Sequence, residues 1–215
     1  MAPGRTAGRR SQQERRSEAE ARLLAAAIEL LSRKGWVGMT LAEVGEAAGY
    51  SRGQATHYFG NKGALLRALT SHLYQSFGED MQAAPPVPAG LQAVLSYVRV
   101  YFERSDRKWT NARAILLLHA EALLENSDTA QVVAEYQREI FIWVVENLRI
   151  GVEQGDVRPD VDPTLGAEFV VGAVRGLAQQ RLSRGPVENI HGVSDQVVQL
   201  IEHAFAADSA RDPRR

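Results

Sequence analysis

The chain has 215 residues, enough to bury the core of one domain or of two unequal ones. Hydrophobic residues make up 45% and charged residues 24%, as in soluble globular proteins, and no run approaches the roughly 18 apolar residues of a membrane span. The absence of cysteine excludes disulfides and thiolate metal sites. The basic N-terminus has no apolar stretch behind it, so we expect no signal peptide, no membrane segment and a cytoplasmic location.

The net charge of −1 hides an uneven distribution of charge along the chain. Residues 1–67 hold 11 Lys and Arg against 6 Asp and Glu, whereas residues 68–215 hold 14 against 20. A basic segment on an acidic body indicates that the basic segment meets a polyanion, although a solvated basic tail would give the same balance.

Three predicted helices open the chain, and each begins with a local start signal. Ser17 and Glu20 have capping-box spacing, and the first helix runs over 17–34 until Gly35 ends it. The same spacing recurs at Thr40 with Glu43 and at Ser51 with Gln54. Two short helices, 40–48 and 51–58, then flank a tight turn at Gly49. This spacing predicts a helix-turn-helix over residues 40–59, whose second helix enters the major groove of DNA.

The remaining chain also shows helical periodicity without sustained alternation. Asn61 is predicted to cap a fourth helix that reaches about residue 77, and the segment AAPPVPAG (83–90) is the clearest break. Further helices are expected near 89–104, 110–125, 129–154, 162–184 and 194–206. Asp128 with Gln131, and Asp162 with Pro163, supply start signals for two of them, and Gly155 ends the one before Asp162. We therefore predict an all-α protein with domains at 18–78 and 79–208.

The predicted helix 51–58 has one polar surface. Ala55 and Phe59 lie four residues apart and point inward. The outward positions are Arg52, Gly53, Thr56 and His57, with Gln54 and Tyr58 beside them. Arg and Gln side chains can form bidentate hydrogen bonds with guanine and adenine, and hydroxyl groups donate to phosphates. Gly53 costs roughly 1 kcal/mol relative to Ala in a helix, which a close approach by another molecule's backbone would justify.

Lys62 stands near the start of the fourth predicted helix, where its charge opposes the helix dipole. The conflict disappears if a phosphate binds there, because free backbone N–H groups and the ammonium then point at the same anion. A simply solvated lysine is the alternative.

The stretch TLAEVGEAAGYSRGQATHYFGNKGALL resembles the DNA-binding signature of TetR-type transcriptional regulators, and the resemblance covers roughly residues 18–78. The matching positions are Thr40, Val44, Ala48, Gly49, Ser51, Gly53, Tyr58, Phe59, Lys62 and Leu65. The resemblance implies phosphate contacts by Thr40, Tyr58 and Lys62. It places Ser51, Arg52, Gly53, Gln54, Thr56 and His57 on the DNA-facing surface, and Arg15 and Arg16 could add an N-terminal arm. Tyr50 departs from the usual Val, and Thr56 stands where a Tyr is frequent, so one backbone contact would be shorter or missing.

The same resemblance implies that the second domain pairs two subunits and binds a small-molecule effector, and that the protein represses transcription until the effector releases it from a palindromic operator. Helices 162–184 and 194–206 carry apolar faces suited to a homodimer, although burial inside one subunit is the alternative. The residues assigned to this interface are Phe169, Gly172, Ala173, Gly176, Val198, Ile201 and Phe205. The candidates for ligand binding are Tyr97, Tyr101, Trp109, Arg113, His119, Tyr136 and Trp143, although such residues are more often part of a core.

An enzyme has little support in the sequence. The five histidines show no metal-ligand spacing, and neither a glycine-rich phosphate loop nor a nucleophile motif is present, so we expect no catalytic residues, metal or cofactor. Two classes of function remain. A ligand-responsive regulator of double-stranded DNA gives Lys62 and the basic segment a partner, whereas a helical small-molecule-binding protein without DNA-binding activity leaves them unexplained.

Overall fold

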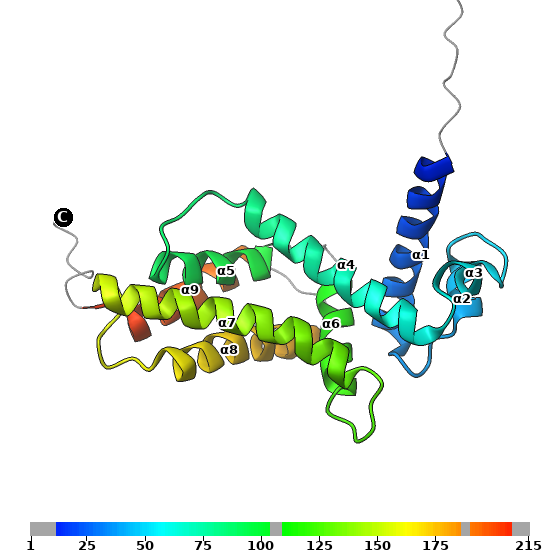
Figure 1. Ribbon diagram of the computed structural model, residues 1–215. Helices are drawn as coiled ribbons and strands as arrows, with labels where there is room; N and C mark the ends of the chain where they lie inside the picture. Colours follow the sequence, from blue (N-terminus) through cyan, green and yellow to red (C-terminus); the bar gives the residue numbers. More distant parts are fainter. Residues whose placement is uncertain (1–11, 104–108, 186–189, 208–215) are drawn as a thin grey trace, which may run out of the picture. The chain divides into compact units, whose positions relative to one another are not determined.

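The computed structural model describes residues 12–103, 109–185 and 190–207 (Figure 1). These residues form α-helices and no β-strand, apart from an isolated antiparallel bridge between Val157 and Ala206. The all-α prediction is therefore confirmed. The chain divides into two compact units, residues 1–69 and 70–215. This division falls inside helix α4 (Lys62–Ala83), whereas the sequence placed it after residue 78.

The first unit contains α1 (Gln12–Lys34), α2 (Leu41–Ala47), α3 (Gln54–Phe59) and the first turns of α4 (Figure 1). Its core is built from leucines and other apolar side chains at helical spacing, namely Leu23, Leu24, Ala27, Ile28, Leu31, Trp36, Met39, Val44, Ala55, Leu65, Leu66 and Leu69. Burying an aliphatic side chain stabilises the fold by roughly 1.5–3 kcal/mol, so this cluster fixes how α2 and α3 lie on α1. The predicted start of α1 at Ser17 is wrong, because the helix already includes Gln12 and runs through Ser17.

The caps of the short helices show which local signals the fold uses. The capping box at Thr40 is confirmed, since its hydroxyl accepts from the Glu43 amide and the Glu43 carboxylate accepts from the Thr40 amide. Asn61 is confirmed as a cap of α4, with 2.8 Å between its Oδ1 and the Ala64 amide nitrogen. The box predicted at Ser51 is wrong. Gly53 is the N-cap residue of α3, and no side chain caps it.

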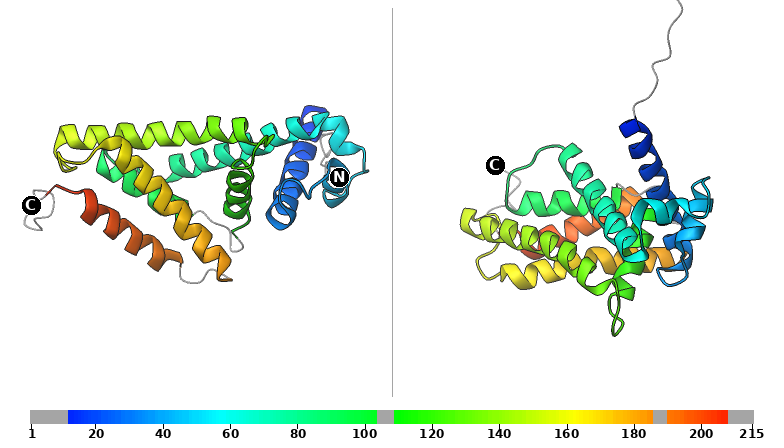
Figure 2. Two further views of the ribbon diagram at one scale, coloured as in Figure 1. Left: turned by 90° about the horizontal axis from the view of Figure 1, so that it is seen from below. Right: turned by 45° about the vertical axis from the view of Figure 1, so that its right-hand side comes forward.

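The second unit contains the rest of α4, then α5 (Leu91–Glu103), α6 (Thr110–Glu121), α7 (Ala130–Gln154), α8 (Pro163–Ser183) and α9 (Ile190–Phe205). Within it α5 packs on α9, and α7 packs along α8 (Figures 1 and 2). One hydrophobic core joins these helices, and α6 packs against it through the partly buried Ala112 and Leu116. Ala114 and Leu118 are the buried residues of α6 itself.

The starts and ends of the longer helices partly follow the predicted signals. Asp162 caps α8 through the amides of Thr164 and Leu165, with Pro163 in the first turn. Gly155 ends α7 in a left-handed conformation, at φ 79°. The predicted start signal at Asp128 is wrong, because Thr129 is the N-cap residue and forms no side-chain cap bond. α4 also runs past the predicted end near residue 77, to Ala83, and α9 begins four residues before 194, at Ile190.

Helix α8 has two apolar faces. Val170, Val174 and Ala178 are fully buried in the core of the second unit. On another side, Leu165 and Phe169 are 65% and 55% exposed. In α9, by contrast, the side chains assigned to a subunit interface, Val198, Ile201 and Phe205, are all buried in the core of the single chain. They are therefore not available to a partner in this structure, and the large apolar side chain that α9 exposes is Leu200.

Candidate nucleic-acid interface and ligand cleft

The turn between α2 and α3 is held by a close backbone contact. A side chain at Gly45 would place its Cβ 2.5 Å from the carbonyl oxygen of Ser51, so only glycine lets the two segments approach this closely. Gly49 lies in the turn at φ 79°, a conformation that favours glycine. The start of α3 is therefore fixed against α2, which is the geometry that a helix-turn-helix needs.

The segment from Arg52 to Phe59, made of the turn before α3 and α3 itself, has an inner and an outer surface. Ala55 is completely buried, and Phe59 is partly buried. Arg52, Gly53, Thr56 and His57 are exposed, while Gln54 and Tyr58 are partly covered. Helical geometry predicts the buried Ala55 and the exposed Thr56 and His57. Arg52 and Gly53 lie in the turn before α3 and not in the predicted helix 51–58, so Gly53, as the N-cap residue, does not carry the cost of a glycine inside a helix. The outer surface thus presents a guanidinium, an imidazole and a hydroxyl beside a bare glycine backbone.

Gln54 has no capping role in this structure. The backbone N–H of Gln54 donates to the carbonyl oxygen of Ser51, with 3.0 Å between nitrogen and oxygen. The side chains of Ser51 and Gln54 form no capping box. Arg52 forms an ion pair with Glu46 at 3.5 Å, and both side chains are at least half exposed. Such an exposed pair contributes little, so Arg52 can exchange its carboxylate partner for a base or a phosphate at small cost.

Two of the predicted phosphate contacts already have partners inside the chain. The Thr40 hydroxyl and amide both contact Glu43, whose carboxylate also accepts from the Lys34 ammonium at 2.7 Å. The hydrogen bonds from Lys34 and Thr40 lower the pKa of Glu43 to about 2. The Tyr58 hydroxyl donates to the carbonyl oxygen of Arg16 at 2.5 Å. In this arrangement neither hydroxyl has a proton left for a phosphate.

Lys62 is the first residue of α4, and its side chain packs on Trp36. The ammonium lies 4.8 Å from the centre of the indole ring and donates to the carbonyl oxygen of Val37 at 3.4 Å. Contact with the negative face of an indole contributes about 0.5–1 kcal/mol at exposed sites, which offsets the unfavourable position at a helix N-terminus. The contacts with Trp36 and Val37 position this positive charge at the start of α4.

A hollow of about 510 Å³ lies between the start of α1 and α3. It is lined by Gln12, Arg15, Arg16, Ala19, Gln54, His57 and Tyr58. The guanidinium carbon of Arg16 lies 5.9 Å from the centre of the Tyr58 ring. Arg15 and Arg16 therefore belong to α1 and line a hollow beside α3, and their role as an N-terminal arm on the DNA stays a prediction.

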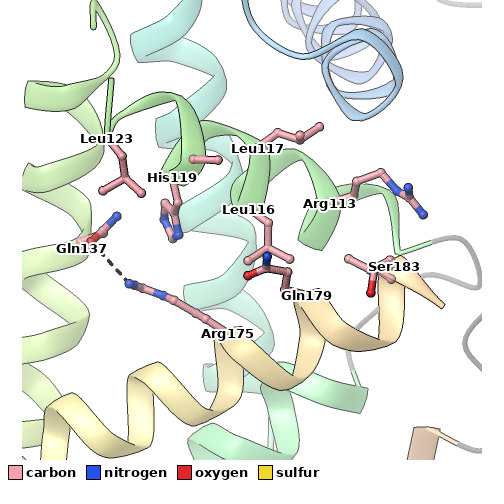
Figure 3. Close-up of a pocket in the computed structure, with 11 residues that line it drawn as sticks. Arg113, Leu116, Leu117, His119, Leu123, Gln137, Arg175, Gln179 and Ser183 are labelled. Carbon is pink, nitrogen blue, oxygen red and sulfur yellow. Dashed lines mark hydrogen bonds between the residues drawn. The ribbon is translucent and has the colours of Figure 1, made fainter. Parts of the chain in front are cut away.

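The second unit contains a cleft of about 560 Å³ between α6, α7 and α8 (Figure 3). Its lining is mostly apolar, with a few polar groups, as in small-molecule sites. The lining residues are Arg113, Leu116, Leu117, His119, Ala120, Leu123, Gln137, Arg175, Gln179, Leu182 and Ser183. Of the ligand-binding residues expected from the sequence, only Arg113 and His119 line this cleft.

His119 is an uncharged group at the inner side of the cleft. Burial, together with the positive charge of Arg175, lowers its pKa to about 3. Its Nε2 lies 3.1 Å from the hydroxyl of Tyr74 on α4, and burial raises the pKa of that phenol to about 12. The pair is therefore neutral at pH 7 and joins α6 to α4 by one hydrogen bond.

The other expected ligand-binding residues fall into separate places. Tyr97 and Trp143 line a second cleft of about 450 Å³ with Tyr74, Phe77, Gly78, Met81, Gln82, Glu139 and Ile140. Tyr101 lines a void of about 30 Å³ between the two clefts. The Tyr136 ring stacks on Tyr74 with 4.9 Å between centres, and Trp109 is a buried part of the core.

Four polar residues of the first cleft were not found from the sequence, namely Ser183 and three with longer side chains. Arg175, Gln137 and Gln179 come from α7 and α8, and Figure 3 shows Arg175 extending toward Gln137. A signal was present, because Arg175 is the single charged residue between Glu168 and Arg181 in an otherwise apolar helix. A single charge in an apolar stretch therefore indicates a candidate binding residue, and a prediction based on aromatic residues misses it.

Over the described ranges no cluster of three or more His, Cys, Asp or Glu side chains is arranged to bind a metal ion. In the same residues no helix combines the length and hydrophobicity required to span a bilayer.

Comparison with known proteins relates the helix-turn-helix to a family. Residues 23–69 match the family described as "Bacterial regulatory proteins, tetR family". The HTH-type transcriptional regulator CymR of Pseudomonas putida is 30% identical over 204 residues, which cover 92% of this chain and 96% of CymR.

Solved structures show the same fold at lower identity. The regulator AibR, solved in complex with isovaleryl coenzyme A and operator DNA, superposes with a TM-score of 0.69 at 22% identity, over 85% of this chain and 97% of AibR. FadR of Bacillus subtilis in complex with stearoyl-CoA gives a TM-score of 0.67 at 16% identity, over 84% and 96% of the two chains. The near full-length match to CymR, added to the helix-turn-helix geometry of α2 and α3, shows that this chain belongs to the TetR family of helix-turn-helix transcriptional regulators.

Proposed function

We propose that this protein is a homodimeric repressor that binds a palindromic operator through α3 and releases it when a small molecule occupies the second unit. The observation that carries this proposal is the outer surface of α3. Arg52, in the turn just before α3, is exposed together with Thr56 and His57 of α3, and the close approach of Ser51 to Gly45 fixes where this helix starts. These side chains face solvent in the single chain, which leaves them accessible to DNA.

The proposed role of each side chain in the interface depends on the contacts that it already forms inside the chain. Arg52, Gln54, Thr56 and His57 read base edges, and Ser51 and Gly53 let the DNA backbone come close. Lys62 and Arg16 contact phosphates, since both side chains are held against aromatic rings and carry a permanent charge. Thr40 positions α2 through its capping box, and Tyr58 ties α3 to α1. These two residues support the interface and reach a phosphate only if their internal bonds exchange.

The proposed subunit interface uses the exposed face of α8. Leu165 and Phe169 lie on this face, and a Cβ added at Gly172 or Gly176 would meet, beyond the adjacent backbone of α8, no atom of the described residues within 4 Å. Ala173 lies between them, and Leu200 of α9 is 69% exposed. Pairing two copies through α8 and α9 would bury these side chains. Two α3 helices would then meet successive major grooves, which lie about 34–36 Å apart.

Effector binding is proposed for the clefts of the second unit. AibR holds isovaleryl coenzyme A and operator DNA in one complex, so a protein of this fold accommodates both partners. An effector can lower the affinity for DNA only by the factor by which it binds more tightly to the conformation that does not bind DNA.

The test is a gel-shift titration with the DNA upstream of the protein's own gene, followed by footprinting. We expect a protected palindrome and a binding curve that weakens steeply with salt. A protein that binds small molecules but no DNA at low salt would overturn the proposal in favour of a helical ligand-binding protein.

A further inference from the structure

Arg175 is a charged group in a cleft that offers it no opposite charge. It is half-buried on α8 and extends between α6 and α7 (Figure 3). Its hydrogen bond to Gln137 Oε1 is 3.4 Å long, well beyond the usual 2.9–3.0 Å or so. In the described residues neither Arg175 nor Arg113, the other charged lining residue, forms an ion pair with a carboxylate.

The rest of the lining supplies no negative charge. It includes no Asp or Glu, and the hydroxyl of Ser183 and the amides of Gln137 and Gln179 are neutral. His119 is uncharged at pH 7, because burial and Arg175 lower its pKa to about 3. Because arginine side chains are protonated at pH 7, the cleft carries a positive charge that its other side chains do not balance.

The same cleft also exposes apolar surface. Leu123 is 86% exposed at its edge, and Leu116, Leu117 and Leu182 contribute further aliphatic side chains. Covering an exposed leucine is favourable by about 25 cal/mol per Å² of apolar area removed from water. A volume of about 560 Å³ is within the range of small-molecule sites. A molecule that complements both the apolar surface and the positive charge of the cleft therefore needs an apolar body and one anionic end.

We propose that the effector of this regulator is a small monocarboxylate with an apolar body, whose carboxylate pairs with the guanidinium of Arg175. The planar guanidinium matches a carboxylate through two parallel hydrogen bonds, and Gln137 and Gln179 can donate from either side. The apolar body lies against the leucines of α6 and α8. This proposal rests on the proposed function, because it names the chemical class of the effector.

A neutral analogue of the same shape would leave Arg175 unpaired while the ligand covers it. Loss of a hydrogen bond to a charged group weakens binding by about 10- to 100-fold. We therefore expect a carboxylic acid to bind that much more tightly than its primary amide. Arg113 lies at the exposed part of the cleft and is not expected to set this preference.

The experiment measures the thermal shift of the full-length protein with aliphatic and aromatic monocarboxylates of 6 to 12 carbon atoms, each beside its primary amide, at pH 7.5. The variants are Arg175→Gln, Arg175→Lys and, as the matched control, Arg138→Gln, an exposed arginine of α7 outside the lining of the cleft. Circular dichroism of each ligand-free variant checks the fold. At least one carboxylate should stabilise the wild type more than its amide does. This difference should disappear in Arg175→Gln, remain in part in Arg175→Lys, and persist in Arg138→Gln.

The proposal is overturned if no carboxylate outperforms its amide, or if Arg175→Gln keeps the difference. It is also overturned if octanoyl coenzyme A binds in an Arg175-dependent way and octanoate does not, since the anion would then be a phosphate. DNA binding by the ligand-free protein is measured separately by fluorescence anisotropy. Wild-type protein that shows the carboxylate preference but binds no DNA would refute the proposed function and leave the ligand class intact.

Discussion

His119 is expected to make the stability of the fold depend on pH. The pKa of this imidazole is lowered from 6.5 to about 3 in the folded chain, first by burial and then by Arg175. Between these two values the unfolded chain binds a proton that the folded chain does not. Stability therefore falls as pH decreases through 6.5, by about 1.4 kcal/mol for each pH unit below it. From pH 7.5 to pH 5.5 the loss amounts to about 1.3 kcal/mol.

The substitution His119→Gln removes the titrating group and keeps a polar side chain that can bond to the Tyr74 hydroxyl. Urea unfolding followed by circular dichroism gives the free energy of unfolding of both proteins at pH 5.5, 7.5 and 8.5. The wild type should lose about 1.3 kcal/mol more than the variant between pH 7.5 and 5.5. Both proteins should change in parallel between pH 7.5 and 8.5, where imidazole is neutral in both states.

A refutation would be an equal loss in wild type and variant between pH 7.5 and 5.5. That result would mean that the imidazole accepts a proton in the folded chain, and that the buried position beside Arg175 is wrong. A larger loss of unfolding free energy in His119→Gln than in the wild type would have the opposite sign to the expected difference and would also reject the reasoning.

Four further predictions concern the first unit and the subunit interface. Lys62→Ala should weaken binding to all DNA sequences alike and lower the salt slope by about one unit in anisotropy titrations, whereas an unchanged slope would restrict Lys62 to its contact with Trp36. Arg52→Ala should relax preference at one or two operator positions, by about 1–3 kcal/mol each in selection from randomised operators, and an unaltered preference would remove its base-reading role. Thr40→Ala should reduce the free energy of unfolding by about 1 kcal/mol in urea, because it breaks the capping box, and a neutral effect would show that the box contributes nothing. Gly176→Phe should give a folded monomer by sedimentation that has lost tight operator binding, since beyond the adjacent backbone of α8 no described atom lies within 4 Å of an added Cβ. A folded monomer with wild-type affinity, or a monomeric wild type, would exclude pairing through α8.

Local capping chemistry explains which helix boundaries the sequence revealed. The signals at Thr40, Asp162 and Gly155 involve atoms within a few residues of each other, so short-range spacing is sufficient to find them. Ser51 has the same spacing to Gln54 as Thr40 has to Glu43, but it does not cap. Its carbonyl is fixed by the close approach to Gly45, a contact between two segments that the spacing of residues does not contain.

The site could be predicted in part for the same reason. The outer positions of α3 follow from helical geometry alone, and Ala55 gives the inner side. Lys62 was recognised as unusual, but its contact with Trp36 joins residues 26 positions apart and needed the structure. The apolar stripe of α9 indicated that Val198 and Ile201 are buried without indicating against which surface, and their own chain covers them.

Helix α4 gives a physical route by which an effector could alter DNA binding. It begins in the first unit with Lys62, beside α3 in the sequence, and continues in the second unit with Tyr74. Tyr74 lines the small void beside Arg175 and pairs with His119, a lining residue of the first cleft. A carboxylate on Arg175 would lie in the same cleft as His119, whose hydrogen bond to the Tyr74 hydroxyl ties α6 to α4. Among the described helices α4 is the one with residues in both units, so we propose that a change at Tyr74 reaches Lys62 along this helix. The proposed carboxylate would then act on the helix that carries a proposed phosphate contact.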